Sequence, residues 1–125
     1  MKYISIDGDD VGRKITACYI SNDEKKLQDI SKKLETTTKC ISSLLVSLKF
    51  KVLFSAADGV AAATDKKVDF SELFEKIRSL APKGFSYSAG VGSSLREAYI
   101  ALQAAKSNGK NRLFEYSEIN AKTIT

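Results

Sequence analysis

The 125-residue sequence predicts one α+β domain, because short runs of strand character alternate with longer runs of helical spacing. The strand-like runs are "KYISI", "KVLFSA", "GVAAAT", "FSYSAGVG" and "RLFEY". Between them, large apolar residues recur three or four positions apart, which is typical of helices that bury one face. The order β, α, β, β, α, β, then a further helix and strand, predicts a ferredoxin-like βαββαβ sheet with an appended helix and C-terminal strand.

The first half of the chain supplies a strand, a short stretch and a long helix. Residues 2–6 form the strand, and residues 10–19 are helical or looped. The long helix begins near Asn22 or Asp23, where leucines and isoleucines adopt helical spacing. Thr36-Thr37-Thr38 are poor helix formers, so the sequence allows a bend there.

The second half supplies a hairpin and two capped helices. A turn at Ala57-Asp58 joins two strands, and Asp69 caps a helix that ends before Pro82. Ser94 and Glu97 have the spacing of a capping box for the appended helix. We expect residues 1–116 to form the domain and residues 117–125 a polar tail that frays.

Composition excludes several functions. Histidine is absent, so Ser-His triads and histidine metal sites are excluded. Cys18 and Cys40 are too few for a disulfide framework, and we expect both to be buried free thiols. The net charge of +5 suits an anionic partner such as a nucleotide or RNA. Without a membrane-length apolar run or a signal peptide, a cytoplasmic protein is expected.

Three carboxylates follow the first strand within four residues: Asp7, Asp9 and Asp10. An EF-hand calcium loop would use Asp7, Asp9 and Gly12, but it requires a preceding helix and a glutamate where Cys18 stands. The plain alternative is a polar loop whose acids cap the next helix and complement its dipole.

A two-metal site is the functional alternative. In a ferredoxin-like sheet the end of strand one lies beside the central hairpin, so Asp7 and Asp58 are predicted to be close. Such a pair can bridge two cations about 4 Å apart, and the Gly8 carbonyl can approach a metal because glycine has no side chain. Asp58-Gly59 also has a plain interpretation, since Asp-Gly favours the positive φ angles of tight hairpins.

Two further features suit a triphosphate. The backbone amides of Asp10, Val11 and Gly12 lie at a helix start, where anions bind. Lys106 and Lys110 lie four residues apart around the end of the appended helix and would share a helical face. Lysines there can equally complement the helix dipole.

These motifs together resemble a known family. "SAGVGSSLREAYIALQAAKSNGKNRLFEY" resembles the C-terminal stretch of GGDEF diguanylate cyclases, and "SIDGDD" resembles their metal-bearing first strand. "FSAADGVAAAT" stands at the position of their signature hairpin. With Ala-Ala-Asp-Gly-Val there, the chain is most similar to the minimal CRISPR polymerases, relatives of the palm domain in the large subunit of type III CRISPR complexes. The resemblance covers nearly the whole chain.

The resemblance implies a palm-type nucleotidyl cyclase, in which a ribose hydroxyl attacks the α-phosphate of an NTP and pyrophosphate leaves. It implies Asp7 and Asp58 as catalytic carboxylates that bind two Mg²⁺ or Mn²⁺ ions, with the Gly8 carbonyl as a further ligand. Nucleotide-binding residues would be Gly8, Asp9, Asp10, Val11, Gly12, Arg13, Lys106 and Lys110. Asp9 would touch metal or ribose, or cap the next helix.

The departures from that pattern shape the expectations. Gly59 replaces the second hairpin acid, and Gly12 replaces a loop lysine for which Arg13 can substitute. The asparagine that reads guanine in those cyclases falls near Ile15, an apolar residue. Adenine, and hence ATP, is therefore favoured. The family's chemistry also implies a homodimer or higher oligomer, a role in phage defence and a product that acts on a separate effector. Neither membrane insertion nor a stable nucleic-acid partner is expected.

Two other interpretations remain open at this point. "KGFSYSAGV" loosely resembles a motif of RRM single-strand RNA-binding modules, with Phe85 and Tyr87 on one strand face, although Gly90 replaces the final aromatic residue. Alternatively, the loss of an acid at Gly59 fits a catalytically inactive palm that only senses nucleotide.

Overall fold

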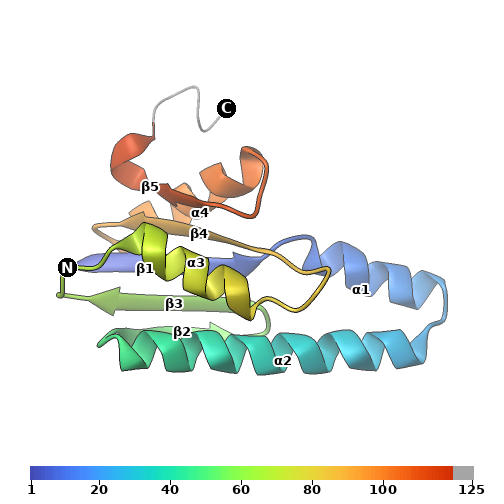
Figure 1. Cartoon of the computed structure of the whole chain (residues 1–125). Coiled ribbons are helices and arrows are strands. Elements are labelled where there is room, and N and C mark those ends of the chain that lie inside the picture. Colours follow the sequence, from blue (N-terminus) through green and yellow to red (C-terminus); the bar gives the residue numbers. More distant parts are fainter. Residues whose placement is uncertain (120–125) are drawn as a thin grey trace.

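The computed structural model describes residues 1–119, which form a five-stranded sheet in the order β2-β3-β1-β4-β5 (Figure 1). The elements are β1 (Lys2–Gly8), α1 (Val11–Ile20), α2 (Glu24–Ser47), β2 (Lys51–Ala56), β3 (Gly59–Thr64), α3 (Phe70–Leu80), β4 (Tyr87–Gly92), α4 (Leu95–Ser107), β5 (Leu113–Glu115) and the 3-10 turn η1 (Tyr116–Glu118). β5 is parallel to β4, and the other pairs are antiparallel. The predicted ferredoxin-like order with an appended helix and strand is confirmed.

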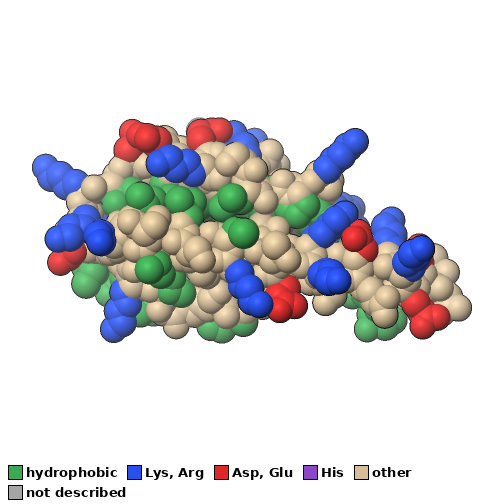
Figure 2. Space-filling model, turned by 60° about the horizontal axis from the view of Figure 1, so that its bottom comes forward, with side chains coloured by type: hydrophobic (Ala, Val, Ile, Leu, Met, Phe, Trp, Pro, Cys, Tyr) green, Lys and Arg blue, Asp and Glu red, His purple; other side chains and the backbone are tan. Residues whose placement is uncertain are grey.

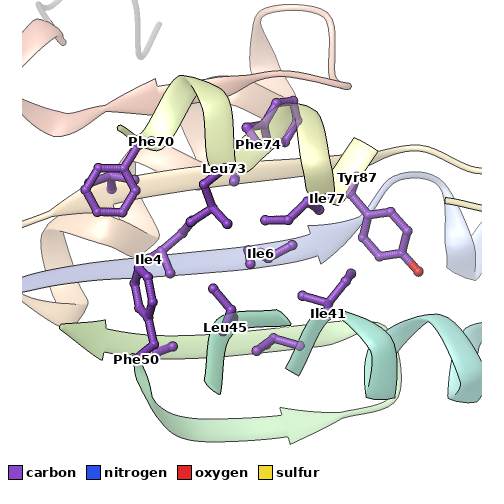
Figure 3. Close-up of a cluster of buried hydrophobic side chains, with 14 residues drawn as sticks. Ile4, Ile6, Ile41, Leu45, Phe50, Phe70, Leu73, Phe74, Ile77 and Tyr87 are labelled. Atoms are coloured by element: carbon purple, nitrogen blue, oxygen red, sulfur yellow. The ribbon is translucent and has the colours of Figure 1, made fainter. Parts of the chain in front are cut away.

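The main core lies between the sheet and the helices α2 and α3 (Figure 3). Ile4 and Ile6 point from β1 into this layer, and both are almost completely buried. They meet Ile41 and Leu45 of α2 and a hydrophobic stripe of α3. The period of two along β1 therefore sends its other side chains, including Asp7, toward the opposite face of the sheet.

Helix α4 packs on that opposite face by close backbone contact. A Cβ placed on Gly90 would lie 2.1 Å from the Leu102 nitrogen and 2.2 Å from the Ala98 oxygen. Only glycine permits this approach, and the buried alanines of α4 extend the same contact. The close packing brings the C-terminal turn of α4 to the end of β1.

Three segments that are distant in sequence meet at one edge of the sheet. The C-terminal end of β1, the β2–β3 turn and the loop after α4 lie together there, and α1 extends beyond them (Figure 1). The pairing of Asp7 with Gly59 places the hairpin directly beside the first strand, as predicted from topology.

The structure corrects several local predictions. Helix α2 is a single α-helix through Thr36-Thr37-Thr38, because burial of Thr37 and Thr38 outweighs their weak helix propensity. Strand β1 continues through Gly8, since its pairing with β4 continues that far, whereas its pairing with β3 ends at Asp7. Cys18 is buried as expected, but Cys40 is exposed.

The boundaries at the C-terminus are also sharper. β4 begins at Tyr87, so Phe85 lies before it. The predicted tail begins inside η1, and its last residues, 120–125, lie outside the described part of the chain.

Basic and acidic side chains are interspersed over the face shown in Figure 2, with hydrophobic side chains between them. They do not gather there into one basic stripe of the kind that tracks a nucleic-acid backbone. None of the helices in residues 1–119 is long and apolar enough to cross a membrane.

Candidate functional site

Asp7 and Asp58 come together at the end of β1, as the topology predicted. Asp58 lies in the two-residue turn between β2 and β3, and its carbonyl accepts a 3.1 Å hydrogen bond from the Gly8 amide. Burial, followed by the charge of Asp7, raises the pKa of the Asp58 carboxyl above its ordinary value of 3.8. The pair is therefore two like charges held near each other, an arrangement that a cation would stabilise.

Gly8 is required for this approach. A Cβ on Gly8 would lie 2.8 Å from the Val11 side chain and 3.1 Å from an Asp58 carboxylate oxygen. Any larger residue would push the Asp58 side chain away from the strand end. The glycine therefore makes room for the second carboxylate, and its own carbonyl faces the same region.

The plain interpretation of Asp58-Gly59 is not borne out, because Gly59 does not have a positive φ. The left-handed residue of the turn is Ala57, at φ 51°. An L-residue in this conformation costs on the order of 1 kcal/mol, so Ala57 must be held by its surroundings. Gly59 instead faces Asp7, and its Cβ would lie 3.5 Å from a carboxylate oxygen of that residue.

Lys106 points from α4 into the site. Its ammonium donates to the Gly8 carbonyl at 2.8 Å and lies 2.9 Å from Asp7 Oδ2. It lies farther from Asp9, at 3.7 Å from Oδ1. The Lys106 ammonium thus contacts oxygens of Asp7 and Gly8, both of which were predicted from the sequence to be metal ligands.

Lys110 reaches the site by a different route from the one predicted. α4 ends at Ser107, and Gly109 (φ 114°) reverses the chain, with the Lys110 amide donating to the Ala105 carbonyl. This is a Schellman-type helix end, so Lys106 and Lys110 do not share a helical face. The Lys110 ammonium nevertheless returns to the site and bonds the Asp10 carboxylate.

Asp10 connects the loop after β1 to two cations. Its carboxylate bonds Lys110 and lies 3.3 Å from Arg13, whose side chain is mostly exposed. The hydrogen bond from Lys110, assisted by the charge of Arg13, lowers the pKa of the Asp10 carboxyl. The side chain does not cap α1, so the capping interpretation of this acid is wrong.

The first turn of α1 presents backbone amides. Asp10 is left-handed (φ 58°), and Val11 begins the helix. The sequence of a left-handed residue and a helical one forms a concave nest of N–H groups, and the first helical amides have no partner within the helix. The Val11 side chain is buried and Gly12 is exposed, so amides are what this segment offers at the surface.

Asp9 has a structural environment. It is 3% exposed, and its oxygens accept hydrogen bonds from the Ser86 and Ser88 hydroxyls, each at 2.7 Å. The backbone amide of Asn111 donates a third hydrogen bond at 3.0 Å. It therefore ties the end of β1 to β4 and to the loop that carries Lys110. Neither helix capping nor an open position facing a ligand describes it.

Tyr87 is the one buried polar side-chain atom without a hydrogen-bond partner in residues 1–119. Its ring closes the end of the core, and its hydroxyl points away from the other labelled side chains (Figure 3). Burial and the charges of Asp58 and Asp7 raise the pKa of Tyr87 to about 12, which the nearby Thr37 only partly offsets. Because Tyr87 is only 2% exposed, it cannot stack on a base. The RRM-like interpretation therefore lacks one of its two proposed base-stacking residues.

The residues present fit a divalent cation bound partly by its substrate. The part of the chain that the structure describes contains no group of three or more His, Cys, Asp or Glu side chains that could hold a metal. Two carboxylates and one carbonyl are available, and Mg²⁺ commonly takes one or two carboxylates and completes its shell with water and phosphates. The like-charge pair and the ammonium already attracted to these oxygens support that fit.

Sequence reasoning missed the residues that hold the site in place: Thr38, Ser86, Ser88 and Asn111. Ser88 carried a signal, since it is a polar residue within an apolar strand. The others gave none, because their partners lie far away in sequence.

Solved structures with similar folds are GGDEF-type domains. The GGEEF domain of a diguanylate cyclase from Vibrio cholerae is 21% identical with a TM-score of 0.67, over 92% of this chain and 81% of that one. The GGDEF domain of DgcB from Caulobacter crescentus, in complex with c-di-GMP, is 15% identical with a TM-score of 0.70, over 94% and 78%. An EAL/GGDEF domain protein from M. capsulatus is 20% identical with a TM-score of 0.66, over 92% and 83%. At these identities the likeness shows the fold alone.

No curated protein matches the chain. The family model of the minimal CRISPR polymerase domain matches residues 3–116. That match spans β1, the hairpin and the Lys106–Lys110 segment, which are the three parts that build the site. The chain belongs to the minimal CRISPR polymerase domain family.

Proposed function

We propose that the domain is a palm-type nucleotidyltransferase that condenses NTPs, with ATP favoured, into a cyclic di- or oligonucleotide and releases pyrophosphate. The observation that carries the proposal is the facing pair Asp7 and Asp58, with the Gly8 carbonyl beside them. These oxygens would hold Mg²⁺ or Mn²⁺, two ions per site. Bound there, the ions would lower the pKa of the attacking hydroxyl and neutralise charge on the α-phosphate.

The chain's own groups would bind and orient the triphosphate. The amides at the start of α1 would donate hydrogen bonds to a phosphate, and Lys110 and Arg13 lie beside them. Lys106 would leave Asp7 and the Gly8 carbonyl when a metal ion takes those oxygens. Its ammonium would then bind a phosphate. The same side chain would thus balance the Asp7 carboxylate in the empty site and a phosphate in the loaded site.

The proposed preference for adenine rests on one apolar residue, Ile15. Ile15, near the position where the similar cyclases place a guanine-reading asparagine, packs against the cluster that α1 and α2 form with Val11, Cys18, Ile30 and Leu34. It offers no hydrogen bond to a base. A cavity of about 330 Å³ between α2 and the hairpin, lined in part by Thr38 and Ala57, offers room for a nucleoside near Asp58.

A cyclic dinucleotide requires two bound NTPs, and the proposed site holds one. We therefore extend the proposal to a homodimer or larger oligomer whose sites face each other, acting in the cytoplasm in anti-phage defence through an effector protein that binds the product. Turnover should rise more steeply than linearly with protein concentration below the dissociation constant of the dimer.

The decisive experiment incubates the purified protein with each α-³²P-labelled NTP and Mg²⁺ or Mn²⁺. We expect a phosphatase-resistant product from ATP, its loss in EDTA, and its loss in Asp58→Asn. Asp65→Asn is the matched control, since Asp65 is an exposed acid after β3 at the other end of the sheet.

No product from any NTP, at concentrations that allow oligomers, would overturn the cyclase proposal. Metal-dependent nucleotide binding without product would favour the inactive sensing palm, for which Gly59 in place of a second acid is the supporting observation. Unchanged activity in Asp58→Asn would show that the metal ligands are assigned wrongly.

A further inference from the structure

Helix α2 contacts the hairpin turn through one buried hydroxyl. Thr38 Oγ1 donates a 2.7 Å hydrogen bond to the carbonyl of Ala57, 19 residues away in sequence. Thr38 is 5% exposed. Threonines within helices commonly bond a carbonyl of their own helix four residues earlier, so a hydroxyl directed across to another element is a specific use of this side chain.

The hydrogen bond acts on the residue that precedes Asp58. Ala57 is left-handed, a conformation that alanine keeps only when its surroundings impose it. On the other side of the turn, the Gly8 amide bonds the Asp58 carbonyl at 3.1 Å. The backbone that carries Asp58 is therefore anchored at two consecutive carbonyls, by α2 and by β1.

The two hydrogen bonds hold the turn against the repulsion between the Asp58 and Asp7 carboxylates. The Asp58 carboxylate is partly buried beside Asp7, and like charges repel. A hairpin turn held only by its own strands could rotate its carboxylate outward into water. The hydrogen bond from Thr38 to the Ala57 carbonyl would oppose that rotation, because it holds the peptide that precedes Asp58.

We propose that Thr38 is a positioning residue, whose hydroxyl fixes the Ala57–Asp58 peptide and so holds the Asp58 carboxylate where it can share a divalent cation with Asp7. The inference rests on the proposed function, because it assumes that these carboxylates bind metal. Thr38 acts through the turn and is not itself a ligand.

The test measures Mn²⁺ affinity without nucleotide, by the loss of the free Mn²⁺ EPR signal. Omitting nucleotide matters, because Thr38 also lines the cavity proposed for the nucleoside. Thr38→Val keeps the shape and removes the hydroxyl, and we expect Mn²⁺ to bind about 10–100-fold more weakly, as for other outer-shell partners of metal ligands. Thr38→Ser restores the hydroxyl and should bind Mn²⁺ with nearly parent affinity. Thr36→Val, on the exposed side of the same helix, is the matched control and should not differ from the parent.

A second measurement needs no metal. The Gly8 amide bonds the Asp58 carbonyl, so hydrogen exchange at Gly8 should be at least about tenfold faster in Thr38→Val, and at the parent rate in Thr38→Ser and Thr36→Val. Exchange in the middle of β1 reports the global fold and should be unchanged. If Thr38→Val is too unstable to assay, Thr38→Ser is compared with a folded Thr38→Ala instead. Equally weak Mn²⁺ binding in these two variants would contradict the role of the hydroxyl.

Parent-like Mn²⁺ affinity in folded Thr38→Val would overturn the positioning role and leave the proposed function standing. Equal weakening in Thr38→Val and Thr38→Ser would overturn it as well, by assigning the effect to packing. Absence of Mn²⁺ binding in the parent protein, both alone and with a non-hydrolysable ATP analogue, would by contrast overturn the metal site itself.

Discussion

Asp7 and Asp9 are separated by one residue, yet their environments are opposite. Asp9 is buried and receives three hydrogen bonds, from two serines and the Asn111 amide. Asp7 is 37% exposed, contacts Lys106 and faces a second carboxylate. The Asp9 carboxylate is satisfied by fixed hydrogen bonds, whereas Asp7 and Asp58 form a pair of like charges beside the single ammonium of Lys106, which a bound cation would stabilise.

The difference separates a structural carboxylate from one that is ready for a ligand. Hydrogen bonds from fixed neighbours saturate Asp9 and tie together β1, β4 and the loop at Lys110. Asp7 and Asp58 retain unsatisfied acceptor capacity toward one side. Three adjacent acids in the sequence therefore have three different roles, with Asp10 serving as the partner of Lys110 and Arg13.

The largest expected effect is at Asp7. Asp7→Asn should lower product formation on the order of 10³-fold, because it removes electrostatic stabilisation at the reacting phosphate. The urea midpoint should change little, since Asp7 is half-exposed. Activity assays and urea unfolding on the same preparation measure both, and a large loss of stability would assign Asp7 to the structural class instead.

Asp9 should behave in the reverse way. In Asp9→Asn, an NH₂ group replaces one carboxylate oxygen that accepts a hydrogen bond, so two donors then face each other. The free energy of unfolding should therefore fall by about 2–4 kcal/mol. Urea unfolding measures it, with the exposed Asp29→Asn as control. Parent-like stability in Asp9→Asn would mean that its three donors find other partners.

A substitution at Lys106 tests the charge balance at the Asp7 and Asp58 carboxylates. Lys106→Met removes the ammonium that competes for Asp7 and the Gly8 carbonyl, so Mn²⁺ alone should bind about tenfold more tightly. Turnover of ATP should fall, because a phosphate loses its partner. Lys32→Met on the exposed face of α2 is the control. Weaker Mn²⁺ binding in Lys106→Met would instead mean that Lys106 organises the ligands.

The pH dependence of stability should have opposite signs for Asp58 and Asp10. The raised pKa of Asp58 means that the folded state binds more protons than the unfolded chain between the ordinary and the raised pKa, so this residue lowers the free energy of unfolding as pH rises through that window. The lowered pKa of Asp10 has the opposite sign, since this residue lowers the free energy of unfolding as pH falls from the ordinary to the lowered pKa.

Urea unfolding in EDTA across this pH range should show that Asp58→Asn is stabilised relative to the parent at neutral pH and loses the advantage in acid. Asp10→Asn should lose part of the parent's stability at neutral pH. A pH-independent difference between parent and Asp58→Asn would contradict the like-charge interpretation of the site.

The smallest effect is expected at Tyr87. Its buried hydroxyl has no hydrogen-bond partner among residues 1–119, so Tyr87→Phe should leave stability unchanged or raise it by up to about 1 kcal/mol. Thermal unfolding measures this. A clear destabilisation would mean that the hydroxyl is bonded in solution, for example through water.

The arrangement of elements could be predicted because its signals are local. Periodicity, the Asp69 and Ser94 caps and the Ala57-Asp58 turn each depend on a few neighbouring residues, and both caps are present in the structure. Topology then placed Asp58 beside Asp7 without any contact being known. The sequence allowed a bend at Thr36–Thr38, but α2 continues as one helix there, since contacts with the hairpin override the weak local propensity of threonine.

The order of the elements, the strand that aims Asp7 and the two lysines around the end of α4 follow from the amino-acid sequence alone. Folding decides which of the three acids is saturated by fixed hydrogen bonds, because Ser86, Ser88 and Asn111 reach Asp9 from positions 77 to 102 residues later. It also decides that Lys110 approaches through a reversed helix end and that Thr38 anchors the turn. Hydrogen bonds between distant segments carry no periodic signal, so these roles emerge only when the chain is folded.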